Sequence, residues 1–297
     1  MHLSSLFASF IVLGSLVAAH SGGHAELVNR AQHEARALQA RKCAPAIAEF
    51  ERVRRERREL RMGKRQEPST TATAPNPHYS TIQNSTCVTA PEVIEGPYYI
   101  GNEYIRYDLR ETQPGVTLVL DLGVIDTTTC EPFVNAFVEL WSANATGQYG
   151  GYEGGDIKKD TFLRGGHFTN DQGIIELTTI YPGFYRGRTA HIHTMIHKDS
   201  ERQANGTIIS SSGTLTHIGQ FFFDEPWNDA VYATNPYTTN TQERTLNSED
   251  MWIEMAGDGA FVNLENLGSS LEEGLLGYIT VAVDGNATYT YENQNTL

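Results

Sequence analysis

The sequence predicts an all-β domain, an antiparallel β-sandwich with long loops, preceded by a helical, basic N-terminal segment. From residue 115 onward the chain consists mainly of short runs rich in Val, Ile, Leu, Phe and Tyr, residue types that favour strands. Gly, Asn, Asp or Pro residues bound these runs, as in turns. No long segment in this region repeats apolar residues with the helical period. Many short strands separated by turns are typical of a sandwich.

The N-terminus predicts a secretory signal peptide, residues 1–19. Leu6 to Ala19 is a continuous run of apolar and small residues that ends in Val17-Ala18-Ala19. The run is shorter than the roughly 20 residues that span a bilayer, and the small residues at its end suit a cleavage site. The alternative is a buried N-terminal helix. We therefore expect a secreted, extracellular protein without a membrane span.

A basic segment, residues 20–65, follows the signal peptide. Residues 1–65 contain 12 Lys and Arg against 6 Asp and Glu, whereas the remainder contains 10 against 30, a net charge of −20. The segment is rich in Ala, Leu, Glu and Arg, which favour helices, and it ends in the dibasic pair Lys64-Arg65. We interpret it as a propeptide that is removed during secretion. The alternatives are a charged helix that stays attached and a nucleic-acid-binding patch. The acidic remainder predicts no binding to nucleic acid or to anionic membranes.

Residues 66–84 are rich in Ser, Thr, Pro and Ala and predict a linker, so the folded domain is expected to span residues 85–297. The chain has three cysteines. Because Cys43 lies in the segment expected to be removed, we predict a disulfide between Cys87 and Cys130 in an oxidising compartment.

Four Asn-x-Ser/Thr sequences occur in the chain. Asn84, Asn205 and Asn286 are candidates for glycosylation at an extracellular surface. Asn144 lies inside a motif described below, where a glycan would crowd the site, and is expected to be unmodified.

Seven strands are predicted along the domain. The polar stretch 198–215, between the fourth and fifth of these strands, is predicted to be a long loop. The predicted strands are residues 115–126, 132–141, 174–180, 191–197, 218–223, 277–283 and 287–291.

The segment 181–193 contains two tyrosines, two arginines and two histidines. Alternate side chains of a strand point to the same face, so His191 and His193 lie on one face at a spacing at which two imidazoles can share a metal. Alone, such a pair is weak evidence, because strands often carry two histidines without a metal. A second segment, Trp141 to Tyr149, runs from a strand into a loop with Gly147 that presents Tyr149.

Together these segments resemble the catalytic domain of the intradiol ring-cleavage dioxygenases over roughly residues 85–240. The same order and spacing occur in that family, and Glu95-Gly96-Pro97-Tyr98-Tyr99 is similar to a Gly-Pro-aromatic segment early in its domain. The resemblance implies a prealbumin-like β-sandwich. The motifs are Trp141-x-Ala-Asn-x-x-Gly-x-Tyr149, Phe162-x-Arg164-Gly165, Asp171-x-Gly173, Tyr181-Pro-Gly-x-Tyr185 and Arg188-x-Ala-His191-Ile-His193.

The resemblance implies a non-haem Fe(III) bound by Tyr149, Tyr185, His191 and His193, with a hydroxide completing the coordination. A phenol has a pKa near 10 and becomes a phenolate ligand when a Lewis acid displaces its proton. Two phenolates with two neutral imidazoles offset most of the charge of Fe(III). Tyr181 is the rival of Tyr185, but the family's ligand position after Pro-Gly-x falls at Tyr185.

The implied reaction inserts both atoms of O2 between the two hydroxyl-bearing carbons of a catechol, giving a cis,cis-muconate-type diacid. The resemblance implies that Tyr185 accepts a proton, that Arg188 stabilises negative charge and that Gln220 hydrogen-bonds the ring or a peroxo intermediate. The alternatives are a surface salt bridge for Arg188 and a core amide for Gln220. Because the enzyme is expected outside the cell, we expect a catechol or plant-derived phenolic substrate. The oligomeric state is not predicted.

Two other functions remain open from the sequence. One is a secreted β-sandwich binding module that retains the metal motif but has no turnover. The other is a zinc hydrolase in which His191 and His193 act with a carboxylate such as Asp199. Zinc gives no reason for two aligned tyrosines, so the second alternative explains less of the pattern.

Overall fold

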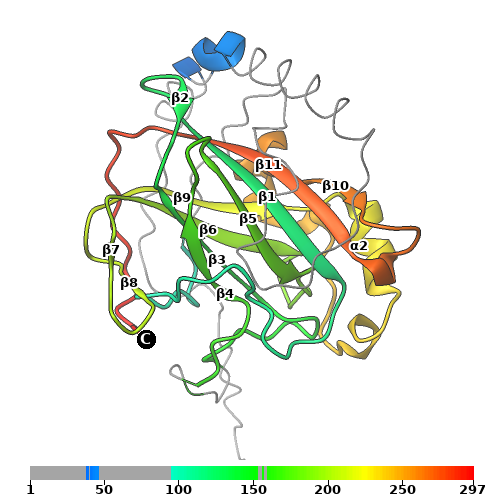
Figure 1. The fold of residues 1–297 in the computed structure, drawn as a ribbon. Helices are drawn as coiled ribbons and strands as arrows, with labels where there is room; N and C mark the ends of the chain where they lie inside the picture. Colours follow the sequence, from blue (N-terminus) through cyan, green and yellow to red (C-terminus); the bar gives the residue numbers. More distant parts are fainter. Residues whose placement is uncertain (1–37, 40, 47–94, 153–155, 157–158) are drawn as a thin grey trace, which may run out of the picture.

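The computed structural model describes residues 38–39, 41–46, 95–152, 156 and 159–297 (Figure 1). The predicted signal peptide and linker, together with Asn84 and Cys87, lie outside the described residues. Most of the predicted propeptide does so as well. Residues 41–46 are helical. Within the described residues, no helix has the length and apolar character needed to cross a bilayer.

Two sheets pack face to face (Figure 1), which confirms the predicted β-sandwich. The first sheet has the order β10-β11-β1-β2, with β5 also paired to β1, and the second has the order β4-β3-β6-β9. β1 and β11 run parallel, and the other pairings are antiparallel. The strands of the first sheet are β1 (Thr117–Asp126), β2 (Glu131–Pro132), β5 (Ile174–Ile180), β10 (Asn263–Asn266) and β11 (Leu275–Val283). Those of the second are β3 (Phe137–Ser142), β4 (Arg164–Phe168), β6 (His191–Lys198) and β9 (Thr214–Phe222).

Alternation along β6 separates the core from the candidate site. Ile192 and Ile196 are buried in the main core, between the two sheets, together with Leu120 of β1 and Leu177 of β5. Residues of the opposite parity, His191 among them, therefore point to the outer face of the second sheet. That outer face is also buried, because loops and residues 95–110 cover it. Both faces of this sheet are thus protected from water.

The strand predictions agree with the structure in the sandwich and fail at its edges. The bounds of β5 are those predicted, whereas residues 287–291 form no strand. The predicted loop at residues 198–215 contains a small hairpin, β7 (Glu201–Arg202) with β8 (Ile208–Ile209). β4 and β10 were not predicted. β4 contains two glycines and β10 is mostly exposed and polar, so neither shows the apolar pattern of a strand.

Apart from the helical residues 38–39 and 41–46, the helices in the described part of the chain are short and lie after the second sheet, mostly within residues 225–260. The α-helices are α2 (Glu225–Tyr232) and α3 (Met251–Ala256), and the 3-10 helices are η1 (Tyr237–Thr239), η2 (Asn247–Glu249), η3 (Asp258–Ala260) and η4 (Leu271–Glu273). Asp250 caps α3 by accepting a hydrogen bond from the Trp252 backbone N–H at 3.0 Å. This cap also contributes to the candidate site, as shown below.

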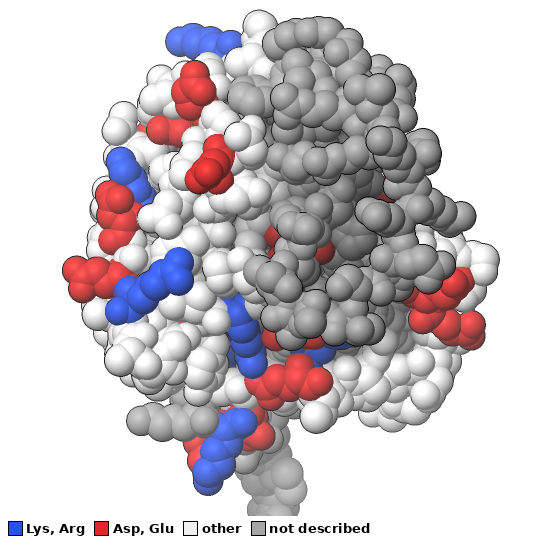
Figure 2. All heavy atoms as spheres, viewed as in Figure 1, with Lys and Arg blue, Asp and Glu red and all other residues white. Residues whose placement is uncertain are grey.

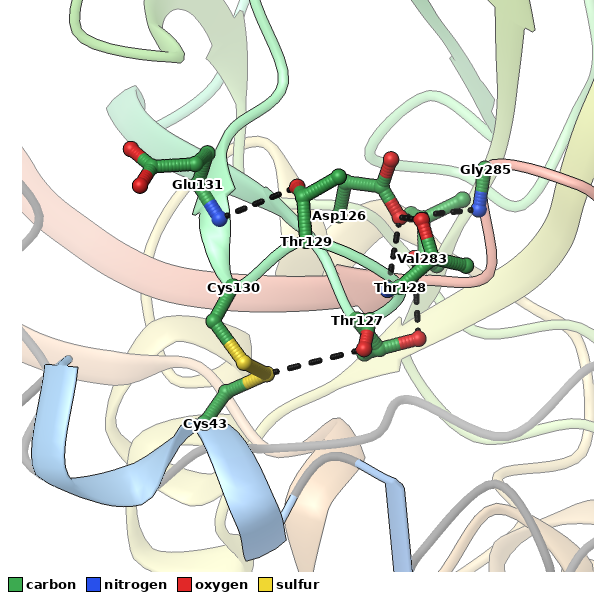
Figure 3. Close-up of a disulfide and its surroundings, with 9 residues drawn as sticks. All are labelled: Cys43, Asp126, Thr127, Thr128, Thr129, Cys130, Glu131, Val283 and Gly285. Carbon is green, nitrogen blue, oxygen red and sulfur yellow. Dashed lines mark hydrogen bonds between the residues drawn. A yellow bond between two sulfur atoms is a disulfide. The ribbon is translucent and has the colours of Figure 1, made fainter.

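The disulfide prediction is wrong, because Cys130 pairs with Cys43 and not with Cys87 (Figure 3). The two Cα atoms are 5.0 Å apart, and the bridge packs with Ile125 and Ile174. The prediction failed because it assumed that Cys43 leaves with the basic segment. A cut after Lys64-Arg65 would instead leave Cys43 covalently attached to the sandwich.

Acidic and basic side chains are interspersed on the face of the molecule shown in Figure 2. Exposed ion pairs of the described chain include Arg110 with Asp108 at 2.7 Å and Lys159 with Asp156 at 3.0 Å. Among the described residues of this face, the basic groups do not form a continuous patch.

Candidate metal centre

The loop that presents Tyr149 is organised by the side chain of Asn144. Its Oδ1 accepts hydrogen bonds from the backbone N–H groups of Thr146 and Gln148, at 3.0 and 3.1 Å, and its Nδ2 donates to Gln113 at 3.1 Å. An Asn side chain that bonds to the following backbone stabilises a tight turn. Asn144 is partly buried, unlike the exposed Asn205 and Asn286. A glycan at Asn144 would disrupt this loop, because it would occupy the nitrogen that contacts Gln113.

Tyr185 and Arg188 are the two ends of a tight turn. The Arg188 backbone N–H donates to the Tyr185 carbonyl at 2.9 Å, and the reverse bond is 3.4 Å. Gly187, inside the turn, has a φ of +83°, a conformation that side-chain-bearing residues rarely adopt. The turn fixes the backbone of a predicted metal ligand relative to that of a predicted catalytic arginine.

The two tyrosine loops are joined by a third segment, residues 240–242. The Gln242 amide donates to the carbonyls of Thr146 and Gly147, at 3.0 and 3.2 Å. The Asn240 amide donates to the Phe184 carbonyl at 2.8 Å. The Tyr149 loop and the Tyr185 loop are therefore held at a fixed separation.

His191 and His193 lie on β6 and are about 1% exposed. The Nδ1 of His191 is 2.7 Å from the Thr189 carbonyl oxygen. A carbonyl can only accept, so Nδ1 carries the proton and Nε2 keeps its lone pair. The indole of Trp141 stacks on the His193 ring, with centroids 4.9 Å apart and planes 5° apart. One histidine is thus oriented by a hydrogen bond and the other by packing.

Four donor atoms converge on one point of this outer face. The Nε2 of His191 is 3.2 Å from the Tyr149 hydroxyl, 3.3 Å from the Tyr185 hydroxyl and 3.2 Å from the His193 Nε2. Atoms about 2 Å from a shared metal ion lie about 3 Å from each other. The donor atoms of Tyr149, Tyr185 and His193 therefore each lie at the distance from His191 Nε2 that ligands of a shared metal ion have.

Burial determines the protonation of the two phenols. Desolvation raises the pKa of Tyr149 well above its ordinary value and raises the pKa of Tyr185, while the charge of Arg188 lowers both pKa values. In the protein without a metal both phenols are therefore neutral at physiological pH. A strong Lewis acid is needed to convert them to phenolates.

Arg188 is buried, and its guanidinium is held in place by a charged partner, Asp250, and a neutral polar partner, Gln220. Its Nε donates to Asp250 at 2.9 Å, in an ion pair whose side chains are 3% and 0% exposed. Its NH2 group donates to Gln220, which lies beside His193 in the β6–β9 pairing. Asp250 also accepts from the Thr189 backbone N–H at 3.0 Å. The alternative of a surface salt bridge for Arg188 is therefore wrong, and Gln220 is a partner of Arg188.

The two alternative metal ligands from the sequence analysis, Tyr181 and Asp199, lie away from the four donors. Tyr181 is fully buried in the sandwich core, and its hydroxyl donates to Asn228 at 2.6 Å. Asp199 is exposed beyond the far end of β6. Within the described part of the chain, no three His, Cys, Asp or Glu side chains are grouped so that they could hold a metal. The zinc alternative with Asp199 is therefore not supported, and a metal here requires the tyrosines.

Sequence reasoning missed Asp250, Arg164 and Gly96. Arg164 donates to the carbonyl of Gly150, next to Tyr149, at 2.7 Å. A Cβ on Gly96 would lie 2.8 Å from the His193 ring. Arg164 and Gly96 stand in motifs that the sequence analysis quoted without giving them roles. Asp250 is 62 residues from Arg188 in the sequence, and no local pattern marks such a contact.

With this geometry established, comparison with known proteins identifies the family. A family model described as "Dioxygenase" matches residues 90–260, more than half of the chain. The chain belongs to the intradiol ring-cleavage dioxygenases. A solved member of this family, an intradiol ring-cleavage dioxygenase from Tetranychus urticae, is 31% identical, with a TM-score of 0.59. The match covers 68% of this chain and 98% of that protein.

Bacterial members of the family are also similar to this chain. Catechol 1,2-dioxygenase of Acinetobacter baylyi is 29% identical over 176 residues, which is 52% of each chain. Catechol 1,2-dioxygenase 1 of Acinetobacter lwoffii is 27% identical over 157 residues, which covers 48% of this chain and 50% of the relative. The chain thus spans about half the length of these relatives.

Proposed function

We propose that this protein is a secreted non-haem Fe(III) dioxygenase that cleaves the ring of a catechol-type aromatic between its two hydroxyl-bearing carbons. Both atoms of O2 enter the product, a cis,cis-muconate-type diacid. The observation that carries the proposal is that the Tyr149 hydroxyl, the Tyr185 hydroxyl and the His193 Nε2 all lie 3.2–3.3 Å from the His191 Nε2. The membership of the chain in the intradiol family supports it.

The donor set fits a trivalent iron. Two phenolates and two neutral imidazoles carry a charge of about −2, which offsets most of the charge of Fe(III), and the anionic oxygens are hard ligands. The chemistry that Fe(III) supplies when bound is Lewis acidity, which ionises the phenols and a chelating catechol and draws electron density from the ring. This ligand set differs from the two-histidine, one-carboxylate set of Fe(II) oxygenases.

The remaining side chains bind and orient the substrate and move protons. Tyr185 is 7% exposed, and once a bound Fe(III) has ionised it, its phenolate oxygen would accept a catechol proton. Arg188 presents a guanidinium that already lowers the pKa of both tyrosines, so it also stabilises negative charge on a bound ring. Gln220 accepts from Arg188 and orients it. Tyr98, stacked on Tyr149 with centroids 4.4 Å apart, forms a wall beside the ligands.

Secretion and the substrate class belong to the same proposal. The predicted signal peptide, the Cys43–Cys130 disulfide and the exposed Asn205 and Asn286 all suit an extracellular protein. Outside the cell such an enzyme would meet plant-derived ortho-diphenols, which are bulkier than catechol. The relatives named above act on catechol by their names.

Oxygen uptake by the iron-loaded protein tests the proposal. Catechol, hydroxyquinol, protocatechuate and caffeate are the substrates, and mass spectrometry with labelled O2 should find both atoms in an acyclic diacid. A matched control is Tyr181→Phe, which changes a core tyrosine outside the donor set and should retain uptake. A protein that shows the visible colour of Fe(III)–tyrosinate but consumes no O2 with any of the four would instead be a binding module.

A further inference from the structure

The arm, residues 95–101, lies directly against the candidate ligands. The Cα of Gly96 approaches the His193 ring so closely that a Cβ there would be 2.8 Å from its Cε1. The Tyr98 ring stacks on Tyr149 and meets Tyr185 edge-on, with centroids 4.4 and 6.2 Å apart. Any displacement of the arm would therefore change the packing of three of the four donors.

The tail, residues 289–297, is attached to the start of this arm through Glu95. One carboxylate oxygen of Glu95 accepts from the Glu292 backbone N–H at 2.9 Å, and the other accepts from the Asn293 backbone N–H at 2.8 Å. Hydrogen bonds to a charged acceptor are stronger than bonds between neutral groups. The two segments are separated by almost 200 residues of sequence.

Asn293 and Asn295 extend the attachment along the arm. The Asn293 amide donates to the Pro97 carbonyl and to the Tyr152 hydroxyl, at 3.1 Å each. Asn295 donates to the same hydroxyl at 3.2 Å. Tyr152 in turn donates to the Tyr99 carbonyl at 3.0 Å, so this hydroxyl links the tail to the middle of the arm.

Backbone pairing and ring packing complete the contact. Gly101 donates to the Asn295 carbonyl at 2.8 Å and accepts from the Leu297 N–H at 3.0 Å. The ring centroids of Tyr291 and Tyr99 are 5.0 Å apart. Tyr99 in turn packs on Trp141, whose indole is stacked on the His193 ring. In Figure 1 the C-terminus lies near β8, beside the beginning of the cyan segment that contains the arm.

We propose that the tail is a positioning element of the metal centre, which holds the arm against His193 and Tyr149. This inference rests on the metal centre proposed above. The tail lies outside residues 90–260, the part that the family model matches, so family membership assigns it no role. A chain without the tail keeps every ligand and every strand of the sandwich, which makes the role testable.

Two variants and one control test this role. The first ends at Tyr291 and so keeps the ring contact with Tyr99 while removing the bonds to Glu95, Pro97 and Gly101. The second is Asn293→Ala, which removes only the side-chain bonds. The control is Gln294→Ala, an exposed residue whose side chain donates to Glu292 within the tail.

The readouts are hydrogen exchange of the arm in the metal-free protein, thermal unfolding, and the visible Fe(III)–tyrosinate band with the rate of iron loss. In both variants we expect arm amides to exchange at least about tenfold faster, the effect of losing one or two hydrogen bonds. The visible band should weaken at equal iron content and iron should dissociate faster. Exchange in β6 should not change, and the Gln294→Ala protein should resemble the unaltered one.

Unchanged exchange in the arm would overturn the proposal, as would faster exchange with an unaltered band and unaltered iron loss. If the truncated chain does not fold, Asn293→Ala decides alone. A missing band in the unaltered protein would refute the metal centre and this inference together. A normal band without O2 uptake would refute only the proposed reaction.

Discussion

Replacing Asp250 with Asn should destabilise the protein by breaking a buried ion pair. The Asp250 and Arg188 side chains are 0% and 3% exposed, and the carboxylate also accepts from the Thr189 N–H. An amide at this position keeps one acceptor but turns an N–H group toward donors. Removing one partner of a buried pair costs about 3–5 kcal/mol, because the remaining charge stays buried without compensation. For a domain of this size that corresponds to a fall in Tm of about 6–20 °C.

Thermal and urea unfolding of the metal-free protein measure this loss. Asp258→Asn is the matched control, because Asp258 is an exposed carboxylate on the neighbouring η3 helix, and it should change stability by less than about 0.5 kcal/mol. The double variant Arg188→Met with Asp250→Asn should lose less unfolding free energy than the two single variants lose in total, by about 1–3 kcal/mol.

The same substitution should lower kcat for the proposed ring cleavage, since Arg188 would no longer be fixed beside the donors. Equal stability of the Asp250→Asn and Asp258→Asn proteins would refute the reasoning. Strict additivity in the double variant would do the same, because it would mean that the two buried charges do not interact.

Three further outcomes follow from the structure. Tyr149→Phe should weaken Fe(III) binding by more than about 100-fold, since losing groups that merely orient ligands already costs 10–100-fold; titration followed by the visible band measures this, and Tyr181→Phe should leave the band intact. Burial raises the pKa of Glu103 to about 7 from 4.5, so the folded protein favours the protonated carboxyl group. The stability that this group contributes is complete below about pH 4.5 and is lost as pH rises through about 7, which lowers the free energy of unfolding by about 3 kcal/mol. Urea unfolding at pH 5 and pH 8 should show this loss in the unaltered protein and not in Glu103→Gln, and identical pH profiles would contradict it. If the secreted chain is cut at its dibasic pair, a reducing gel should release the N-terminal segment and a non-reducing gel should not, because Cys43 and Cys130 are bonded; a segment already absent without reductant would show that this bridge does not form.

The sandwich and the four converging donors were predictable because their signals are local. Two histidines separated by one residue share a face in any strand, whereas the two tyrosines were assigned through short motifs whose order and spacing resemble those of the intradiol family. The apolar runs of β1, β5 and β11 likewise report their burial directly. What could be read from the sequence was therefore the part of the site that each segment specifies alone.

The parts that were missed depend on contacts between distant segments. Asp250 meets Arg188 across 62 residues, and Glu95 meets the tail across 197 and 198. The cysteine pairing failed for a related reason, since counting cysteines cannot tell which two Cα atoms lie close together. No periodicity in the sequence encodes these distances.

Strand β6 places a particular constraint on change in this protein. Its residues alternate between the sandwich core and the donor cluster, so the loss or gain of one residue before His191 would rotate every following side chain to the opposite face. Both imidazoles would then enter an apolar layer, and Ile192 would take the place of one of them in the donor cluster. Single substitutions along β6 can be absorbed one at a time, whereas a one-codon insertion or deletion would remove the centre and disrupt the core together. Length variation among related chains should therefore be confined to the segments that connect the strands.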